Sequence, residues 1–214
     1  MKTLRAALPL ALTLVGFVVM GGLVVRKIVA LGAGFGGLAC AAAALIYAAW
    51  LAWESRVSAR ELAVRGPDHD RGTMELAAFA KYAVLFAAIL PGDAPTPVPA
   101  GIGLALMVFG VAIRTSAIQR LGRGYSHRIR RPAGPVVTSG PYAVVRHPAY
   151  LGTLLAHTGL VLVLLNAWSL GALLLLWYPA VLARTVLEDR YLRELPEYAA
   201  YASRVRGSLL AHFF

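Results

Sequence analysis

Long apolar runs separated by short polar stretches dominate this chain of 214 residues. As α-helices, most of these runs are long enough to cross roughly 30 Å of hydrocarbon. The pattern therefore predicts an all-α fold, a polytopic transmembrane helical bundle of five to six membrane segments. The predicted segments are 6–25, 31–53, 74–90, 100–118, 151–165 and 167–183.

The last two runs are joined only by Asn166 and its neighbours, which predicts an antiparallel helical hairpin at the C-terminal end of the bundle. Its first arm, 151–165, is only about 22 Å long as a helix and falls short of a full span. Residues 184–214 are charged and predict a helical tail on the cytoplasmic membrane surface. The first run, 6–25, starts like a signal peptide, but its length and the runs after it favour an uncleaved helix.

The polar stretches between these runs carry further signals. We interpret 54–73 as a solvated loop and 91–99, which is rich in proline and lacks basic residues, as an outer connector. Four glycines at the start of the second segment predict close helix packing in lipid, and Trp50 and Trp53 at its end are placed like an interfacial aromatic belt. Lys81 falls near the middle of the third segment, where an ammonium group snorkels, pairs or lines a polar cavity.

Composition supports a membrane protein, with 59% apolar and only 14% charged residues. The net charge of +11 would suggest nucleic acid in a soluble domain, but the basic residues cluster between the apolar runs. Placing both termini in the cytoplasm puts 18 of the 21 lysines and arginines on the inner side of an inner or plasma membrane. The single cysteine, Cys40, excludes an internal disulfide and argues against a cysteine-based metal site, and we predict no metal.

The stretch 140–152 concentrates reactive and backbone-shaping residues between apolar segments. Pro141 and Pro148 disfavour helix at the residue before each, and an irregular polar backbone at a membrane surface must be wet, covered or bound to a ligand. Tyr142, His147 and Tyr150 offer rings and hydrogen-bonding tips at the same place. The alternative interpretation is a capped loop that enters a helix, with Arg146 and His147 facing lipid headgroups.

Arg184 and Glu188 form a second cluster, four residues apart on one helix face. The hairpin returns the chain to its starting side, so we expect these two residues to lie beside the 140–152 stretch. The alternative is an ion pair on the helix surface, which contributes little.

Taken together, these motifs resemble the isoprenylcysteine carboxyl methyltransferase family, part of a broader set of integral membrane methyltransferases that includes phospholipid N-methyltransferases. The resemblance covers about 113–206, and 1–99 match only in hydropathy. It rests on Thr138-Ser-Gly-Pro-Tyr142, Arg146-His-Pro-Ala-Tyr150, Gly152, Arg184, Glu188-Asp189 and Leu192. Two departures stand out: the family's usual glutamate pair is Glu188-Asp189 here, and Leu195-Pro196 replaces a Phe-Gly before the tyrosines of the tail.

The resemblance implies a division into N-terminal transmembrane helices, 1–99, and a methyltransferase core, 100–214. It implies S-adenosylmethionine as cofactor, with S-adenosylhomocysteine as product, in a cytoplasm-facing pocket. It also implies that Arg184 and Glu188 are catalytic and that Arg184, with Arg146 beside it, binds the substrate carboxylate. The implied cofactor contacts are His127, Gly134, Pro135, Val136, Val137, Tyr142, His147, Pro148, Ala149, Tyr150 and Glu188.

Methyl transfer to a carboxylate joins opposite charges, so a dry, preorganised site favours it, and an acceptor ionised at pH 7 needs no general base. We expect methyl esterification of a lipid-like or prenylated substrate, with no nucleic acid and no obligate protein partner. One alternative is a phospholipid or amine N-methyltransferase, which would need a base such as His127 or His147. Others are a non-catalytic sensor or scaffold that keeps the pocket, and a transporter.

Overall fold

The computed structural model describes residues 18–61, 69–132 and 134–209, and every regular element in these ranges is helical. The prediction of an all-α bundle is confirmed there. After a helix over 18–31, the elements are α2 (Phe35–Glu61), α3 (Thr73–Ile89), α4 (Pro97–Leu121), the 3₁₀ turns η1 (Gly122–Gly124) and η2 (Gly140–Ala143), α5 (Pro148–Val163), α6 (Ala167–Ala172), the π-helical η3 (Leu173–Trp177), α7 (Tyr178–Arg193) and α8 (Pro196–Arg204).

Three helical stretches in the described residues are long and apolar enough to cross a membrane, and α5 is a shorter apolar helix. Large apolar side chains such as Phe79, Trp168 and Leu175 are exposed, as lipid-facing residues are. The protein is thus an integral membrane protein, with three of the five to six predicted spans meeting this criterion. Most of the predicted first segment, 6–25, lies outside the described residues. The three stretches are Phe35–Val57, Pro97–Gly124 and Ala167–Arg193.

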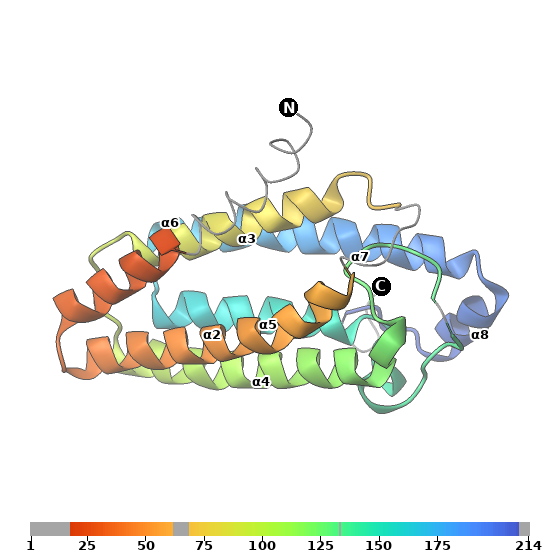
Figure 1. The fold of residues 1–214 in the computed structure, drawn as a ribbon, viewed down its shortest axis with the longest axis horizontal. Helices are drawn as coiled ribbons and strands as arrows, with labels where there is room; N and C mark the ends of the chain where they lie inside the picture. Colours follow the sequence, from red (N-terminus) through yellow and green to blue (C-terminus); the bar gives the residue numbers. More distant parts are fainter. Residues whose placement is uncertain (1–17, 62–68, 133, 210–214) are drawn as a thin grey trace.

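The helices form two layers (Figure 1). α3 runs beside the continuous helix made of α6, η3 and α7, while α2, α4 and α5 form the other layer. The chain reverses at Asn166, as predicted, where the Asn166 side chain accepts from the Ser169 backbone N–H in a capping box. The two arms of the predicted hairpin nevertheless belong to different layers, because α5 packs mainly on α4 and α7 mainly on α3.

Glycines allow α4 and α5 to pack backbone to backbone. Gly103 faces Gly159 and Gly110 faces Gly152, in antiparallel register. A Cβ atom at Gly110 would lie 2.5 Å from the backbone nitrogen of Ala156, so a side chain there would push the helices apart. Close approach of this kind is how helices associate in lipid, where apolar burial alone gives little drive. This close pair of helices positions Arg114 of α4 and Tyr150 of α5, which both line the candidate site.

The second segment differs from its predicted bounds of 31–53. Gly32 adopts a left-handed conformation (φ 66°) in a turn that precedes α2, and α2 continues to Glu61 through the first part of the predicted polar loop. No glycine or proline interrupts that part, so the helix extends beyond its apolar stretch. Trp50, predicted in an interfacial belt, is only 4% exposed and packs inside the bundle. Neighbouring aromatic and charged side chains inside the bundle outweigh the interfacial preference at this position.

The C-terminal tail folds back on the stretch 140–152. The tail helix, predicted from its charge pattern, is confirmed as α8, which begins at Pro196. Beyond α8 the chain runs beside the turn before α5, where Arg146 and His147 donate their backbone N–H groups to the carbonyl oxygens of Gly207 and Ser208, each at 2.9 Å. The tail therefore covers the turn that the sequence singled out.

Candidate active site

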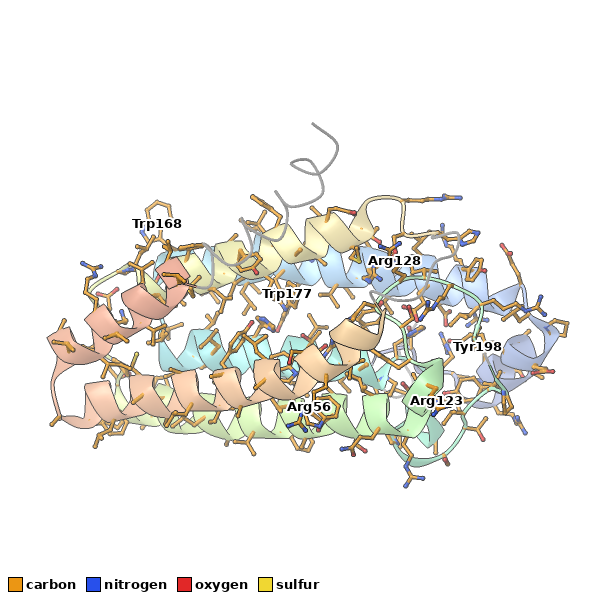
Figure 2. All side chains as sticks on the ribbon, viewed as in Figure 1. Arg56, Arg123, Arg128, Trp168, Trp177 and Tyr198 are labelled. Atoms are coloured by element: carbon orange, nitrogen blue, oxygen red, sulfur yellow. The ribbon has the colours of Figure 1, made fainter. Side chains whose placement is uncertain are left out.

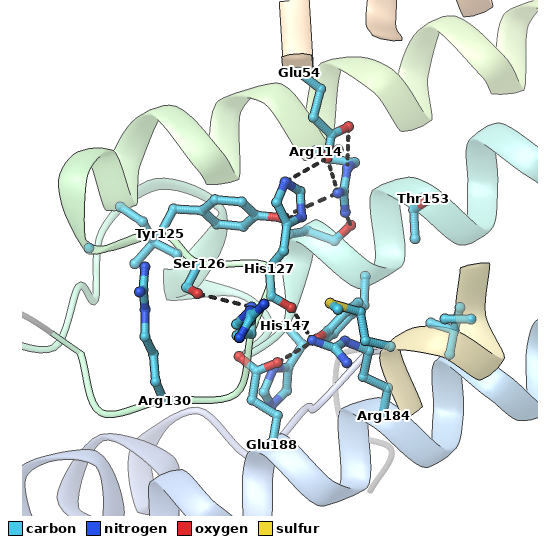
Figure 3. Close-up of a pocket in the computed structure, with 18 of the residues that line it drawn as sticks. Glu54, Arg114, Tyr125, Ser126, His127, Arg130, His147, Thr153, Arg184 and Glu188 are labelled. Atoms are coloured by element: carbon cyan, nitrogen blue, oxygen red, sulfur yellow. Dashed lines mark hydrogen bonds and ion pairs between the residues drawn. The ribbon is translucent and has the colours of Figure 1, made fainter. Parts of the chain in front are cut away.

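One cavity of about 1010 Å³ opens between the two layers. It is lined by residues of α2, α3, α4, α5 and α7 and by the loop 123–137. Of the thirteen site residues predicted from the sequence, twelve line this cavity, and Pro148 is the exception. We call the part of the cavity bordered by 123–137, 146–150 and 184–188 its outer end. In Figure 3, Arg184 and Glu188 extend from one helix toward His127 on the facing loop.

The turn before α5 is shaped by its glycine and prolines. Gly140 has φ 63°, a left-handed conformation that other residues rarely adopt, and it opens the 3₁₀ turn that contains Tyr142. His147 is the N-cap of α5 and, at φ −123° and ψ 58°, lies outside the helical region that proline disfavours for the residue before it. Pro148 is the first helical residue and is buried in the protein, so its role is to start α5 rather than to line the cavity.

Asp189 joins this turn to both α7 and α8. The Arg146 guanidinium grips its carboxylate with two contacts of 2.9 and 3.2 Å, and His147 Nε2 lies 3.1 Å from the same carboxylate. The hydroxyl of Tyr198 donates to it at 2.9 Å, and Arg193 adds an ion pair at 2.7 Å. Arg146, predicted to bind substrate, is thus held by protein groups, including two carbonyl oxygens of the tail.

Arg184 is anchored at the start of α3, in its own layer, and by the loop above the cavity. It is 5% exposed, its ion-pair partner is Asp70 at 2.6 Å, and it also donates to Thr73 Oγ1 and to the carbonyl oxygen of His127. These contacts use at most three of its five N–H donors. A further acceptor on the cavity side can therefore be bound without breaking them. They also tie α7 to the start of α3 and to the loop above the cavity.

Glu188 is oriented by Tyr150 rather than by Arg184. The Tyr150 hydroxyl donates to Glu188 Oε2 at 2.5 Å, so a residue of α5 fixes a carboxylate of α7 at the outer end of the cavity. The nearby Tyr142 is 6% exposed. Burial raises the pKa of its hydroxyl, and the charge of Glu188 raises that pKa further, so Tyr142 remains a neutral hydrogen-bonding group.

A buried ion pair that the sequence did not predict closes the side of the cavity next to α2. The Arg114 guanidinium binds the Glu54 carboxylate and donates to the Tyr125 hydroxyl at 3.2 Å and the Ala149 carbonyl oxygen at 3.2 Å. Tyr125 in turn lies 3.3 Å from His127 Nδ1. The available signal was a glutamate and an arginine at the edges of apolar runs, where charges are costly unless paired.

Metal chemistry finds no support in the described ranges. Among residues 18–61, 69–132 and 134–209, no three His, Cys, Asp or Glu side chains are grouped so that they would hold a metal ion. The charged and aromatic side chains that line the outer end of the cavity are tyrosines, histidines, arginines and one carboxylate. This set suits an organic ligand that carries charge and flat rings.

Comparison with known proteins gives a consistent result. Residues 103–194 match the model of the isoprenylcysteine carboxyl methyltransferase (ICMT) family. A probable protein-S-isoprenylcysteine O-methyltransferase of Oryza sativa subsp. indica is 32% identical over 113 residues, which cover 50% of this chain and 59% of the rice protein. The protein-S-isoprenylcysteine O-methyltransferase of Saccharomyces cerevisiae is 31% identical over 109 residues, 49% of this chain and 46% of the yeast protein.

A third relative is the cobalt-zinc-cadmium resistance protein CzcN of Cupriavidus metallidurans, 44% identical over 78 residues and 35% of each chain. The matches to the rice and yeast proteins span about half the length of those relatives. The family model includes Arg114, the turn before α5, Arg184 and Glu188, but not Glu54, Asp70 or Lys81. Residues 103–194, which carry most of the candidate site, are thus similar to the isoprenylcysteine carboxyl methyltransferase family.

Proposed function

We propose that the protein is an integral membrane methyltransferase that uses S-adenosylmethionine to esterify the carboxylate of a lipid-like or prenylated acceptor. The observation that supports this most directly is the cavity lined by Arg184, Glu188 and the turn before α5, within the segment that the family model matches. In this proposal 100–214 forms the methyltransferase core, and the helices of 1–99 complete its walls. Both termini and the outer end of the cavity face the cytoplasm.

The outer end fits the cofactor in charge and shape. S-adenosylmethionine, when bound, supplies a methyl group on a positively charged sulfur. Glu188 has one oxygen engaged by Tyr150, and its Oε1 has no hydrogen-bond or ion-pair partner among the described residues, so it can receive a cationic amine. The ring of Tyr142 and the loop 134–137 line the same space and provide flat and backbone contacts.

Arg184 is the best-placed group for an acceptor carboxylate. Its contacts with Asp70, Thr73 and the His127 carbonyl oxygen hold the guanidinium in one orientation, with two N–H donors left for a ligand. An arginine fixed in this way binds a carboxylate with little further loss of conformational freedom. A carboxylate is already ionised at neutral pH, so the protein need only position it and exclude water.

The test measures methyl transfer from labelled cofactor in detergent micelles, with an S-prenylated cysteine derivative as acceptor. We expect Arg184→Ala to raise the KM for the acceptor and lower kcat, together at least about 100-fold in kcat/KM. Glu188→Gln should mainly weaken cofactor binding, measured by calorimetry. Arg190→Ala is the matched control, because Arg190 lies on the same helix but is exposed. The variants must keep the thermal unfolding transition of the wild type to be compared.

The chemical nature of the product separates the candidate reactions. A methyl ester is hydrolysed by mild base and releases labelled methanol, whereas an N-methyl group is stable under these conditions. Base-stable label would replace the esterification proposal with amine methylation. Unchanged turnover in both Arg184→Ala and Glu188→Gln, or no binding of the cofactor to the wild type, would overturn the assignment of the site.

A further inference from the structure

The cavity extends beyond its outer end into a second compartment, which we call the inner chamber. Its lining includes Tyr47, Trp50, Lys81, His157 and Trp177. On three helices these residues lie about two turns from the outer end: Lys81 is eight residues from Thr73, His157 is seven from Tyr150, and Trp177 is seven from Arg184. At 1.5 Å per residue, the inner chamber lies about 10–12 Å deeper in the bundle.

Lys81 places an ammonium group in this chamber. It lines the cavity and is partly exposed to it, and its nearest aromatic contact is the Tyr82 ring at 5.4 Å. No hydrogen bond or ion pair of Lys81 is formed with any residue in the described part of the chain. Glu54 and Arg114 are close enough to act on it electrostatically, but they form an ion pair with each other and not with Lys81. Among the described residues, Lys81 therefore has no carboxylate bonded to it.

Two indole rings in the chamber wall carry further donors without acceptors among the described residues, and these N–H groups are covered by protein rather than open to the chamber. Within the described ranges, the Nε1 atoms of Trp50 and Trp177 are buried and donate to no acceptor. Figure 2 shows Trp177 between the two layers, in contrast to Trp168 at the surface. A buried donor without an acceptor costs about 1–3 kcal/mol. Most buried polar groups in folded proteins are hydrogen-bonded, so two unpaired indole N–H groups near an unpaired ammonium group are unusual.

The remaining polar groups of the chamber satisfy each other. His157 is fully buried, and its Nδ1 lies 2.8 Å from the Thr153 carbonyl oxygen, so Nδ1 carries the hydrogen. Nε2 then accepts from the Tyr47 hydroxyl at 3.3 Å. This pair consumes the hydroxyl hydrogen but offers no anion to Lys81. The chamber is thus rich in donors and poor in acceptors.

A plain hydrocarbon tail is a poor match for such a chamber. Burying the Lys81 ammonium group against hydrocarbon leaves it without an acceptor. Lys81, Tyr47 and Trp50 lie outside residues 103–194, so the matched segment alone does not define this part of the cavity. A ligand with negatively charged oxygen atoms would match this lining, because it would supply an acceptor for the Lys81 ammonium group.

We propose that the inner chamber binds an anionic oxygen group of the acceptor, with Lys81 as its main contact. The acceptor would be an amphiphile that carries a carboxylate or similar anion about 10 Å from the carboxylate that is methylated. This inference rests on the proposed function, because it takes Arg184 as the contact for the methylated carboxylate. Lys81 is then a specificity-determining residue, and the transferred methyl group never reaches it.

The test compares two acceptors that share a cysteine carboxylate and differ only at the far end of the tail, which is either a methyl group or a carboxylate about 10 Å away. Binding is measured without cofactor through tryptophan fluorescence, because Trp50 and Trp177 line the chamber. We expect wild-type protein to bind the dianionic acceptor at least tenfold more tightly. Lys81→Met should abolish this preference, and Lys81→Arg should keep most of it. Arg190→Met removes an exposed charge and should change nothing.

Turnover gives a second readout. With the wild type, the preference should appear in KM rather than in kcat, because Lys81 contacts the tail and not the reacting atoms. Equal binding of the two acceptors by the wild type, or an unchanged preference in Lys81→Met, overturns the inference even if methyl transfer is observed. Selective binding of the dianion without any methyl transfer would instead keep the anion site and reject the proposed reaction.

Discussion

The outer end and the inner chamber of the cavity contrast in how their charges are satisfied. At the outer end each buried arginine has a carboxylate partner: Asp189 for Arg146, and Asp70 for Arg184. In the inner chamber Lys81 has no such partner among the described residues. A site with satisfied charges is rigid before a ligand arrives, whereas an unsatisfied one gains most when a ligand supplies the missing groups. The contrast predicts opposite responses to mutation.

Loss of the Asp189 carboxylate should have the largest effect. Asp189→Ala leaves Arg146 and His147 without their shared partner and removes the bond from Tyr198 of α8, so we expect a loss of about 3–5 kcal/mol in the free energy of unfolding and no detectable activity. Chemical denaturation in detergent measures the free energy of unfolding, and methyl transfer from labelled cofactor measures the activity. Arg193→Ala, which removes the exposed member of the same cluster, should cost less than about 1 kcal/mol. If both variants lose a similar free energy of unfolding, Asp189 does not hold the turn before α5, α7 and α8 together.

A side chain at the α4–α5 contact should have the next largest effect. Gly110→Ala places a Cβ atom against the backbone of α5 and should lower the free energy of unfolding by about 1–3 kcal/mol. Gly101→Ala is the control, since a Cβ atom there meets nothing within 4 Å. Because α4 and α5 carry residues of both compartments, we expect cofactor and acceptor binding to weaken together. A stability equal to that of Gly101→Ala would argue against close packing.

Removal of one hydrogen bond at the outer end should give a smaller and more selective effect. Tyr150→Phe leaves the Glu188 carboxylate without its 2.5 Å donor, and a bond to a charged group contributes about 1.5–3 kcal/mol. We expect at least about tenfold weaker cofactor binding by calorimetry, with little change in acceptor binding. Tyr178→Phe, which removes another tyrosine hydroxyl bonded to Thr158, provides the comparison. If acceptor binding falls as much as cofactor binding, Tyr150 does not act through Glu188.

The smallest effect on stability is expected in the inner chamber. Trp177→Phe removes a buried N–H group that has no acceptor in the described part of the chain, and this gain offsets the lost ring contact with His157. The free energy of unfolding without ligand should therefore change by less than about 1 kcal/mol, while affinity for the dianionic acceptor falls. A loss as large as that of Asp189→Ala would mean that the two compartments do not differ as described.

The sequence anticipated the elements and the lining of the outer end better than the ion pairs. The turn before α5 and the spacing of Arg184 and Glu188 were visible because prolines, glycines and helical periodicity act locally. The ion-pair partner of Arg184 was not visible in the sequence, because Asp70 lies more than a hundred residues away and no local pattern connects the two residues. Lys81 was noticed, but only the packing of the layers decides between a snorkelling, a paired and a cavity-lining ammonium.

Trp50 shows the same limit from another direction. Its place near the end of an apolar run is typical of an interfacial residue, yet it packs against the Arg114 guanidinium, 5.8 Å from its ring, and edge-on against His157. Hydropathy describes how residues partition between lipid and water, and it does not distinguish a residue facing lipid from one facing a polar interior. The inner chamber was hidden from the sequence for this reason.

The wide π-helical turn at Leu173–Trp177 has a consequence for how this helix can change over time. Each added residue rotates the downstream face of a helix by about 100°, so the turn shifts the direction in which α7 side chains point relative to those of α6. Deleting one residue from the turn would swing the Arg184 and Glu188 side chains out of the cavity together.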